Sequence, residues 1–408
     1  MWAIRTCNGD CERPTSRIMK AWTRPGWWPW PRLIVYSVAV AAVVVAGSLF
    51  GTGWYYGNVL KDQALVPDHK PHLLDLRVVA VGGDQVTLRA KGGSGNDEGW
   101  SWRGTYGLEW PGGYGQVGEI RSIDGLQVVR DFRPVHSTLA EGAMARIDSF
   151  TFPGDPVQAF GIGFEEVVVA GELGPLPAWF VPGRSDTWAV FVHGKDSNRR
   201  EVLRILPTLQ RLGFPVLVIT YRNDEGVAPD PGGFHRYGLA EWRDLEAAVA
   251  YALDHGARRL LPIGFSMGGG IVASFLYESP LARQVAAVVF DSPMLDFGAT
   301  IDMKAKASGL PGLVAGPVKW AAGLRYGIDW SRLDYIRRAD QLGAPILLFH
   351  SESDAMVPVS VSDRLAKARP DLVTYRRTPD AGHVRSWNVD PAGYEAALAD
   401  FLRPFAGD

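Results

Sequence analysis

Cysteine is nearly absent from this chain of 408 residues. The two cysteines, Cys7 and Cys11, both lie in the first dozen residues. No second ligand pair accompanies their C-x3-C spacing, so we expect free thiols rather than a disulfide or metal site. The rest of the chain therefore folds without disulfides, which is compatible with either side of a membrane. The net charge of −2 provides no bulk field that would favour nucleic acid. We expect no metal, no cofactor and no nucleic-acid partner.

Charge is also absent from a long stretch near the start, since no charged residue occurs between Arg32 and Lys61. The run Leu33 to Phe50 is almost entirely apolar, and about 20 such residues span a hydrocarbon core of about 30 Å. Aromatic residues, which favour the membrane interface, lie at both ends of the run. They are Trp22, Trp27, Trp28 and Trp30 before it, and Trp54, Tyr55 and Tyr56 after it. We therefore predict a transmembrane helix over 33–52.

Basic residues predict the orientation of this helix. Six of them precede the apolar run, whereas only Lys61 and Lys70 follow it closely. The positive-inside rule then makes 1–32 a cytoplasmic tail and places the large C-terminal part outside the cell membrane, after a juxtamembrane linker over 53–75. Three alternatives stay open: a signal peptide cleaved near Ala46-Gly47-Ser48, a buried core helix, or translation from Met19, which would remove both cysteines.

Residues 76–150 have the pattern of a small β-rich module. Two short apolar runs flank Gly82-Gly83-Asp84, which is a hairpin signal, and further short strands with turn residues follow. The module is rich in aromatic residues, which either form its core or bind a ligand such as a glycan. These residues are Trp100, Trp102, Tyr106, Trp110 and Tyr114.

From about residue 160 to the end, apolar runs typical of strands alternate with amphipathic stretches typical of helices. The run Thr187 to Val192 is nearly continuous in apolar residues, as are Pro215 to Tyr221, Val285 to Phe290 and Pro345 to His350. Strands buried on both faces have this pattern, which indicates an α/β domain whose mostly parallel sheet lies between helices.

The segment Gly264-Phe265-Ser266-Met267-Gly268 matches the motif G-x-S-x-G. A strand-like run precedes it and a helix-compatible stretch follows it, which is the setting of a nucleophile elbow. Glycine is needed on both sides because the turn is strained and larger side chains would clash with neighbouring backbone. We therefore predict Ser266 as the nucleophile and Gly264 and Gly268 as the elbow glycines.

A serine hydroxyl becomes nucleophilic when a base takes its proton, and the expected chain order is serine, acid, histidine. Of the eight histidines, only His383 follows a candidate acid. Asp354 lies just beyond the strand ending at His350 and is the predicted acid, with Glu352 in reserve. Its role would be to fix the imidazole tautomer and stabilise the imidazolium.

An oxyanion hole requires two backbone N–H groups. One is expected from Met267, directly after the nucleophile. The other is expected from Lys195, in the loop His193-Gly194-Lys195-Asp196 that follows a strand. We expect the Lys195 side chain itself to be solvated.

The segment from about 164 to 404 resembles the α/β-hydrolase superfamily, particularly its serine aminopeptidase-like branch. The resemblance implies an eight-stranded, mostly parallel sheet and acyl transfer to water. In the resembling family 293–344 is the usual place for a lid, and the apolar residues of this stretch fit either a lid over the pocket or ordinary helix packing. Ser351 and Asn223-Asp224 depart from the family pattern, where glycine is frequent. The matching segments are Phe191-Val-His-Gly, Ile219-Thr-Tyr-Arg, Gly264-Phe-Ser-Met-Gly-Gly, Phe290-Asp-Ser-Pro, Asp354-Ala-Met-Val-Pro and Ala381-Gly-His.

Three functions fit these observations. The first is a membrane-anchored serine esterase or lipase-like hydrolase acting on a small-molecule or lipid acyl substrate. The second is a peptidase or thioesterase, since a triad does not distinguish ester, amide and thioester bonds. The third is a non-catalytic envelope-binding protein that acts through the β module. The sequence does not determine the oligomeric state.

Overall fold

The computed structural model describes residues 30–91 and 99–407, so most of the expected cytoplasmic tail, with Cys7 and Cys11, lies outside the described residues. By its internal contacts the chain divides into two units, 1–49 and 50–408. Helix α1 (Trp30–Leu60) is long and apolar enough to cross a membrane, and no other helix among the described residues meets both conditions. All described side chains from 32 to 48 are exposed.

The stretch expected to be a juxtamembrane linker is different in the structure. Helix α1 runs through Leu60 and is followed by one turn of π-helix, η1 (Lys61–Leu65). Leu60 and Leu65 are buried in the main core of the second unit. The carbonyl oxygens of Ala64 and Leu65 accept hydrogen bonds from the Tyr237 hydroxyl and the His235 N–H, both at 2.7 Å. Residues 53–65 are therefore part of the folded domain, because their apolar side chains find a partner surface there.

Residues 76–148 form a closed barrel in the order β1-β2-β5-β4-β3-β6. The hairpin predicted at Gly82-Gly83-Asp84 joins β1 to β2. Tyr106 and Trp110 are buried in the core of the barrel, and Trp100 and Trp102 pack against that core, so these rings form no exposed ligand platform. Tyr114 is also buried, and its hydroxyl donates to Asp148. The strands are β1 (Leu76–Gly82), β2 (Gln85–Ala90), β3 (Tyr106–Trp110), β4 (Gly113–Asp124), β5 (Gln127–His136) and β6 (Met144–Asp148).

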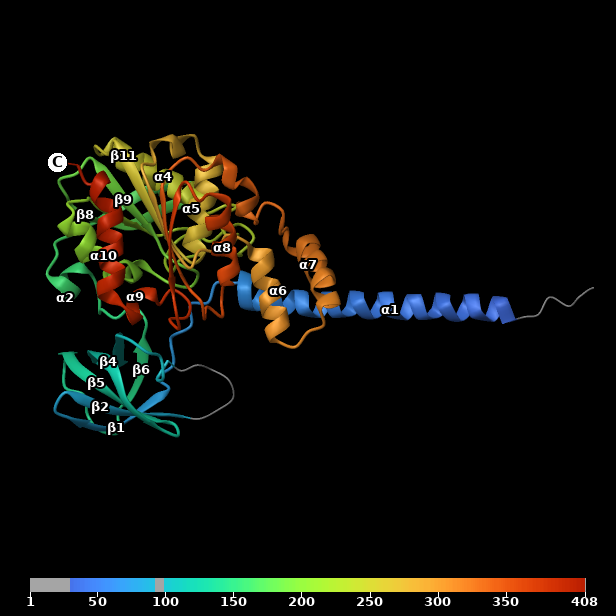
Figure 1. The fold of residues 1–408 in the computed structure, drawn as a ribbon, viewed down its shortest axis with the longest axis horizontal. Helices are drawn as coiled ribbons and strands as arrows, with labels where there is room; N and C mark the ends of the chain where they lie inside the picture. Colours follow the sequence, from blue (N-terminus) through green and yellow to red (C-terminus); the bar gives the residue numbers. More distant parts are fainter. Residues whose placement is uncertain (1–29, 92–98, 408) are drawn as a thin grey trace, which may run out of the picture. The chain divides into compact units, whose positions relative to one another are not determined.

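The α/β domain is built on one sheet in the order β14-β13-β12-β11-β9-β10-β8-β7 (Figure 1). Strands β7, β8 and β10 pair antiparallel, and all pairs from β10 to β14 are parallel. The strands are β7 (Glu165–Gly171), β8 (Gly174–Val181), β9 (Thr187–Val192), β10 (Val216–Ile219), β11 (Arg259–Phe265), β12 (Val288–Asp291), β13 (Ile346–Ser351) and β14 (Val373–Thr378).

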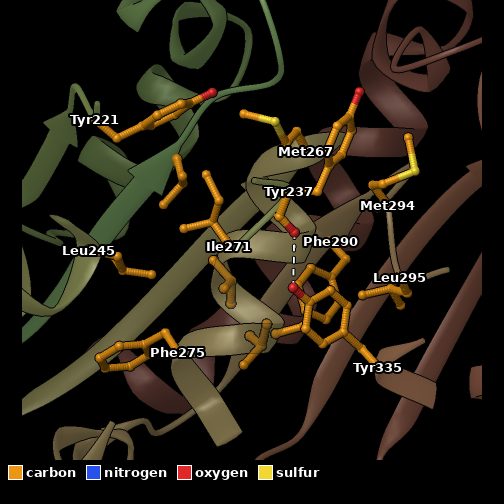
Figure 2. Packing of buried hydrophobic residues seen from close by; sticks show 14 of the residues in the cluster. Tyr221, Tyr237, Leu245, Met267, Ile271, Phe275, Phe290, Met294, Leu295 and Tyr335 are labelled. Atoms are coloured by element: carbon orange, nitrogen blue, oxygen red, sulfur yellow. Dashed lines mark hydrogen bonds between the residues drawn. The ribbon is translucent and has the colours of Figure 1, made fainter. Parts of the chain in front are cut away.

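Helices cover both faces of this sheet, as the sequence predicts. Alternate residues of β9 enter different cores: Val190 and Val192 join one cluster, and Ala189 and Phe191 the other. Helices α4 (Trp242–Asp254), α5 (Met267–Glu278) and α8 (Val359–Ala368) contribute to the first cluster, part of which Figure 2 shows around α5. The second cluster receives α3 (Leu206–Arg211) and α10 (Pro391–Leu402), near the short helices α2 (Pro156–Phe160) and α9 (Ser386–Val389).

Two helices lie in 293–344, the segment that fits either a lid or ordinary helix packing. They are α6 (Phe297–Ala307) and α7 (Gly312–Tyr326), and they precede the 3-10 turn η4 (Tyr335–Gln341). Val314, Val318 and Ala322 of α7 are buried in the first core cluster. Beyond this segment the chain returns to the sheet at β13.

Candidate active site

Ser266 occupies the sharp turn between β11 and α5. Its backbone has φ 51° and ψ −118°, a strained conformation for a residue with a side chain. A Cβ atom at Gly264 would lie 2.5 Å from the Gly268 carbonyl oxygen, and one at Gly268 would lie 2.2 Å from the Val192 oxygen. Both positions therefore require glycine, as the sequence pattern suggests. The turn presents the Ser266 hydroxyl at the carboxyl end of the central strand.

His383 and Asp354 lie in a hydrogen-bonded chain with this hydroxyl. The Nε2 atom of His383 is 2.8 Å from the Ser266 Oγ, and its Nδ1 atom is 2.8 Å from Asp354 Oδ2. Asp354 is buried, whereas the His383 side chain is 18% exposed. In this arrangement the imidazole can take a proton from the serine while the carboxylate orients it. Glu352, the reserve acid, is exposed and lies beside Arg377.

Asp354 is held as a carboxylate by its surroundings. Burial alone would raise the pKa of this carboxyl, but His383 and several hydrogen bonds outweigh that effect and hold the pKa well below its usual range. Its Oδ1 accepts from the backbone N–H groups of Met356 and Val357 at 2.8 and 2.9 Å. The buried His350 ring lies 3.2 Å from Oδ2 on the other side. The acid can therefore accept a hydrogen bond from His383 without itself being protonated.

The loop after β9 lies against the nucleophile. A Cβ atom at Gly194 would lie 3.2 Å from the Ser266 Cβ. The Gly194 carbonyl accepts from the Tyr221 hydroxyl at 2.8 Å, and a trans peptide then directs the Lys195 N–H to the opposite side. Within the described residues, neither the Lys195 nor the Met267 N–H donates to another protein group. Both residues line the same cavity as Ser266, so their N–H groups are available to an oxyanion.

The side chain of Lys195 differs from the expectation of a solvated lysine. It is 18% exposed, and its Nζ pairs with the neighbouring Asp196. Lys195 and Asp196 both line the cavity above Ser266. The salt bridge therefore forms part of the cavity wall.

A buried network supports this loop and was not predicted from the sequence. Glu201 accepts a hydrogen bond from the Gly194 N–H at 2.9 Å and another from Arg204. Arg204 also donates to the carbonyl of Val384, which follows His383 and has a positive φ of 52°. One ion pair thus links the loop at Gly194 to the loop at His383. Asn198 and Glu201 have the spacing of a capping box, and Asn198 does accept from the Arg200 N–H, but the Glu201 carboxylate accepts from Gly194 instead.

A cavity of about 460 Å³ opens above Ser266 and His383. Its walls are mainly apolar and come from three helices: Tyr56, Val59 and Leu60 from α1, then residues of α6 and α7. A second cavity, of about 510 Å³, lies between β14 and α10. Ser266, Asp354 and His383 are not among the residues that line it. No cluster of three potential metal ligands occurs within the described ranges.

This sheet, its helices on both faces and its strand–turn–helix at Ser266 define the α/β-hydrolase fold. Among solved structures, the chain is similar to the esterase Pf2001 of Pyrococcus furiosus. In one crystal form the TM-score is 0.51 at 23% identity, covering 63% of this chain and 96% of that one. In another form the TM-score is 0.50 at 21% identity, covering 63% and 98%.

Two curated relatives are similar to this chain over a little more than half of its length. The uncharacterized protein Rv2307c of Mycobacterium tuberculosis is 26% identical over 223 residues, 53% of this chain and 72% of that protein. The uncharacterized protein YfhR of Escherichia coli K12 is 23% identical over 240 residues, 56% and 76% of the two chains. The barrel has its own match: residues 77–148 fit the family model described as a domain of unknown function, DUF8805.

Proposed function

We propose that this protein is a membrane-anchored serine hydrolase that cleaves acyl esters. The observation that supports it most directly is the chain from the Ser266 hydroxyl through His383 to Asp354, at the base of an apolar cavity. The esterase neighbours share the fold, and the motifs resemble the serine aminopeptidase-like branch in particular.

In the proposed reaction, His383 Nε2 takes the Ser266 proton as Oγ attacks the ester carbonyl carbon. The N–H groups of Lys195 and Met267 stabilise the oxyanion of the tetrahedral intermediate. His383 then returns the proton to the departing alcohol, which leaves an acyl-enzyme on Ser266. Water, activated by His383, hydrolyses this ester to release the carboxylic acid and free enzyme. Asp354 stabilises the imidazolium in both halves.

Esters are proposed over amides because the walls of the cavity are mainly apolar and suit an acyl chain. Thioesters and amides remain alternative substrates, since the same three residues serve all three bonds. A panel of p-nitrophenyl esters, acyl thioesters and aminoacyl anilides separates these activities by kcat/KM.

The first prediction concerns the nucleophile. Replacing Ser266 by alanine should lower ester turnover by about 10⁵–10⁶-fold, because it removes the group that forms the acyl-enzyme. A fluorophosphonate probe should label the wild type and fail to label Ser266→Ala. The exposed Ser331→Ala is the matched control and should be labelled normally. A folded wild type that resists the probe, or a labelled Ser266→Ala, would contradict the proposal.

Helix α1 anchors the enzyme in this proposal as a single membrane span, with the basic tail in the cytoplasm and the hydrolase outside. The apolar helix near the N-terminus supports an anchor, and the basic residues before it support this orientation. The domain limits are part of the same proposal: a barrel at 76–150 and a hydrolase domain from 160 to the end.

A further inference from the structure

Helix α7 is apolar on two sides. One side packs in the core through Val314, Val318 and Ala322. The other exposes Leu313, Trp320 and Leu324, at positions i, i+7 and i+11 of one face, with exposed fractions of 68, 57 and 68%. A helix that is apolar all round is usually buried or in contact with lipid. Three large apolar side chains on one exposed face therefore require a partner surface.

The charge around this face is mostly basic, and the one nearby acid, Asp302, pairs with Lys319 at 2.7 Å. Residues 303–326 contain Lys304, Lys306, Lys319 and Arg325 but no aspartate or glutamate. Tryptophan and leucine on one side of a helix, with lysine and arginine around them, are typical of helices that lie in the membrane interface. Anionic lipid headgroups would attract such a segment. This combination favours a lipid surface over an acceptor protein.

The same face continues onto α1. The rings of Trp320 and Phe50 lie 6.1 Å apart, and the Arg325 guanidinium lies 3.9 Å from the Trp54 ring. A Cβ atom at Gly53 would lie 2.7 Å from the Pro317 oxygen, so the two helices are in close backbone contact there (Figure 1). Phe50 and Trp54 are themselves exposed and lie at the end of the apolar part of α1. The exposed face of α7 is thus continuous with Phe50 and Trp54 of α1.

The cavity begins just beyond this point. Tyr56 and Val59 of α1 line it, and Tyr56 follows Phe50 by six residues, about 9 Å along a helix. Ala315 and Val318 of α7 line it from the opposite helix. The end of α1 and the α6–α7 segment together therefore form walls of the space above Ser266.

We infer that the exposed face of α7 lies in the bilayer interface, and that the substrate is a membrane-resident long-chain acyl ester that reaches Ser266 through the cavity lined by α1, α6 and α7. This inference rests on the proposed hydrolase function for its substrate, but not for its membrane contact. The apolar end of the lipid passes from the bilayer into an apolar cavity, so its chain does not cross water.

The membrane contact is tested without any activity measurement. The full-length protein, with Cys7 and Cys11 replaced by serine, is reconstituted in phosphatidylcholine–phosphatidylglycerol vesicles. An environment-sensitive fluorophore on Leu324→Cys should shift to the blue and be quenched by spin-labelled lipid. The control is Val168→Cys, which is also exposed but lies on β7. Quenching at 168 equal to that at 324, or none at 324, would overturn the contact.

The substrate class is tested with two esters that share a leaving group. Replacing Leu313, Trp320 and Leu324 together by aspartate should lower hydrolysis of vesicle-borne 4-methylumbelliferyl oleate by about tenfold or more, since charge is expelled from the apolar boundary. Soluble 4-methylumbelliferyl butyrate should be cleaved at the wild-type rate. Equal losses on both esters, or no loss on either, would overturn the inference. Val168→Asp is the matched control.

The role of α1 as a cavity wall has its own variant. Val59→Trp should fill part of the cavity and shift the preferred acyl chain to shorter lengths, with fluorophosphonate labelling of Ser266 retained. An unchanged chain-length optimum would show that acyl chains lie elsewhere. If the probe labels no form of the protein, the hydrolase proposal fails instead, and the fluorophore at 324 still decides the membrane contact.

Discussion

At the residue scale, the site depends on backbone strain that distant groups hold in place. Ser266 and Val384 both have positive φ values, and Val384 directly follows His383. Arg204 and the Ser292 hydroxyl bond to the two backbone groups of Val384 at 2.6 and 3.1 Å. The motif at Ser266 can be recognised in the sequence, because both of its glycines lie two positions from the serine. The support of Val384 is not visible, because Arg204 is 180 residues away in the chain.

His350 shows why order along the chain is an incomplete guide. Its position before Asp354 argued against a role as the general base, and His383 is indeed the ring beside Ser266. However, His350 is buried behind the carboxylate, where its Nδ1 contacts the Ser362 Oγ at 2.6 Å. The sequence shows only that a histidine lies four residues before the acid. The turn after β13 places the Asp354 carboxylate between the rings of His350 and His383.

A pH prediction also belongs to this scale. Burial raises the pKa of the Asp291 carboxyl to about 6, although Arg204 and the Tyr394 hydroxyl act in the opposite direction. The native state therefore binds more protons than the unfolded state between about pH 4 and 6, and stability falls as pH rises through this window. Compared with Asp291→Asn, the wild type should lose about 3 kcal/mol from pH 4 to pH 7.

Thermal unfolding of both forms in detergent, at several pH values, measures this difference. The exposed Asp254→Asn is the control for the loss of one carboxyl group. A constant difference between the wild type and Asp291→Asn across the range would contradict the assigned protonation.

At the element scale, the barrel is tied to the hydrolase by buried polar contacts. Asp148 of β6 accepts from the Tyr114 hydroxyl and from Arg200, both at 2.6 Å. The Asn388 amide donates to the Thr105 carbonyl at 2.8 Å. The sequence predicts a β module and a hydrolase domain separately, because each has its own strand pattern. It does not predict these contacts, since no periodicity encodes which surfaces meet.

The contacts of Asp148 with Tyr114 and Arg200 lead to a prediction about stability. Replacing Asp148 by alanine leaves Tyr114 and Arg200 without their buried acceptor, so the protein should lose about 3 kcal/mol of unfolding free energy. The more exposed Asp131, which pairs with Arg121 on β4, is the comparison, and its replacement should cost about 1 kcal/mol or less. Urea unfolding measures both. Similar losses for the two variants would show that the barrel contact contributes little.

At the scale of the whole molecule, the natural cysteines can test the proposed orientation of the proposed membrane span. Cys7 and Cys11 precede the span, so an impermeant maleimide should label them in spheroplasts only after the membrane is opened. A cysteine placed at the exposed Ser331, in a chain with serine at 7 and 11, should be labelled without that step.

The reverse pattern would place the hydrolase in the cytoplasm. The mass of the mature protein shows whether the segment with both cysteines is present. A mass that lacks this segment would indicate translation from Met19 or cleavage of the N-terminal segment. The first of these leaves α1 intact, whereas cleavage near Ala46 would remove most of its apolar run.

The sequence by itself determined the features that depend on near neighbours in the chain. These are the apolar run of α1, the alternating strands and helices, and the glycines around Ser266, because local sterics and periodicity fix each of them. Only the tertiary structure decided which segments of the chain pack against one another. The sequence predicts a linker over 53–75, yet residues between 56 and 64 line the cavity because α6 and α7 offer an apolar surface. Such pairing depends on three-dimensional packing between segments more than 200 residues apart, which no local pattern records.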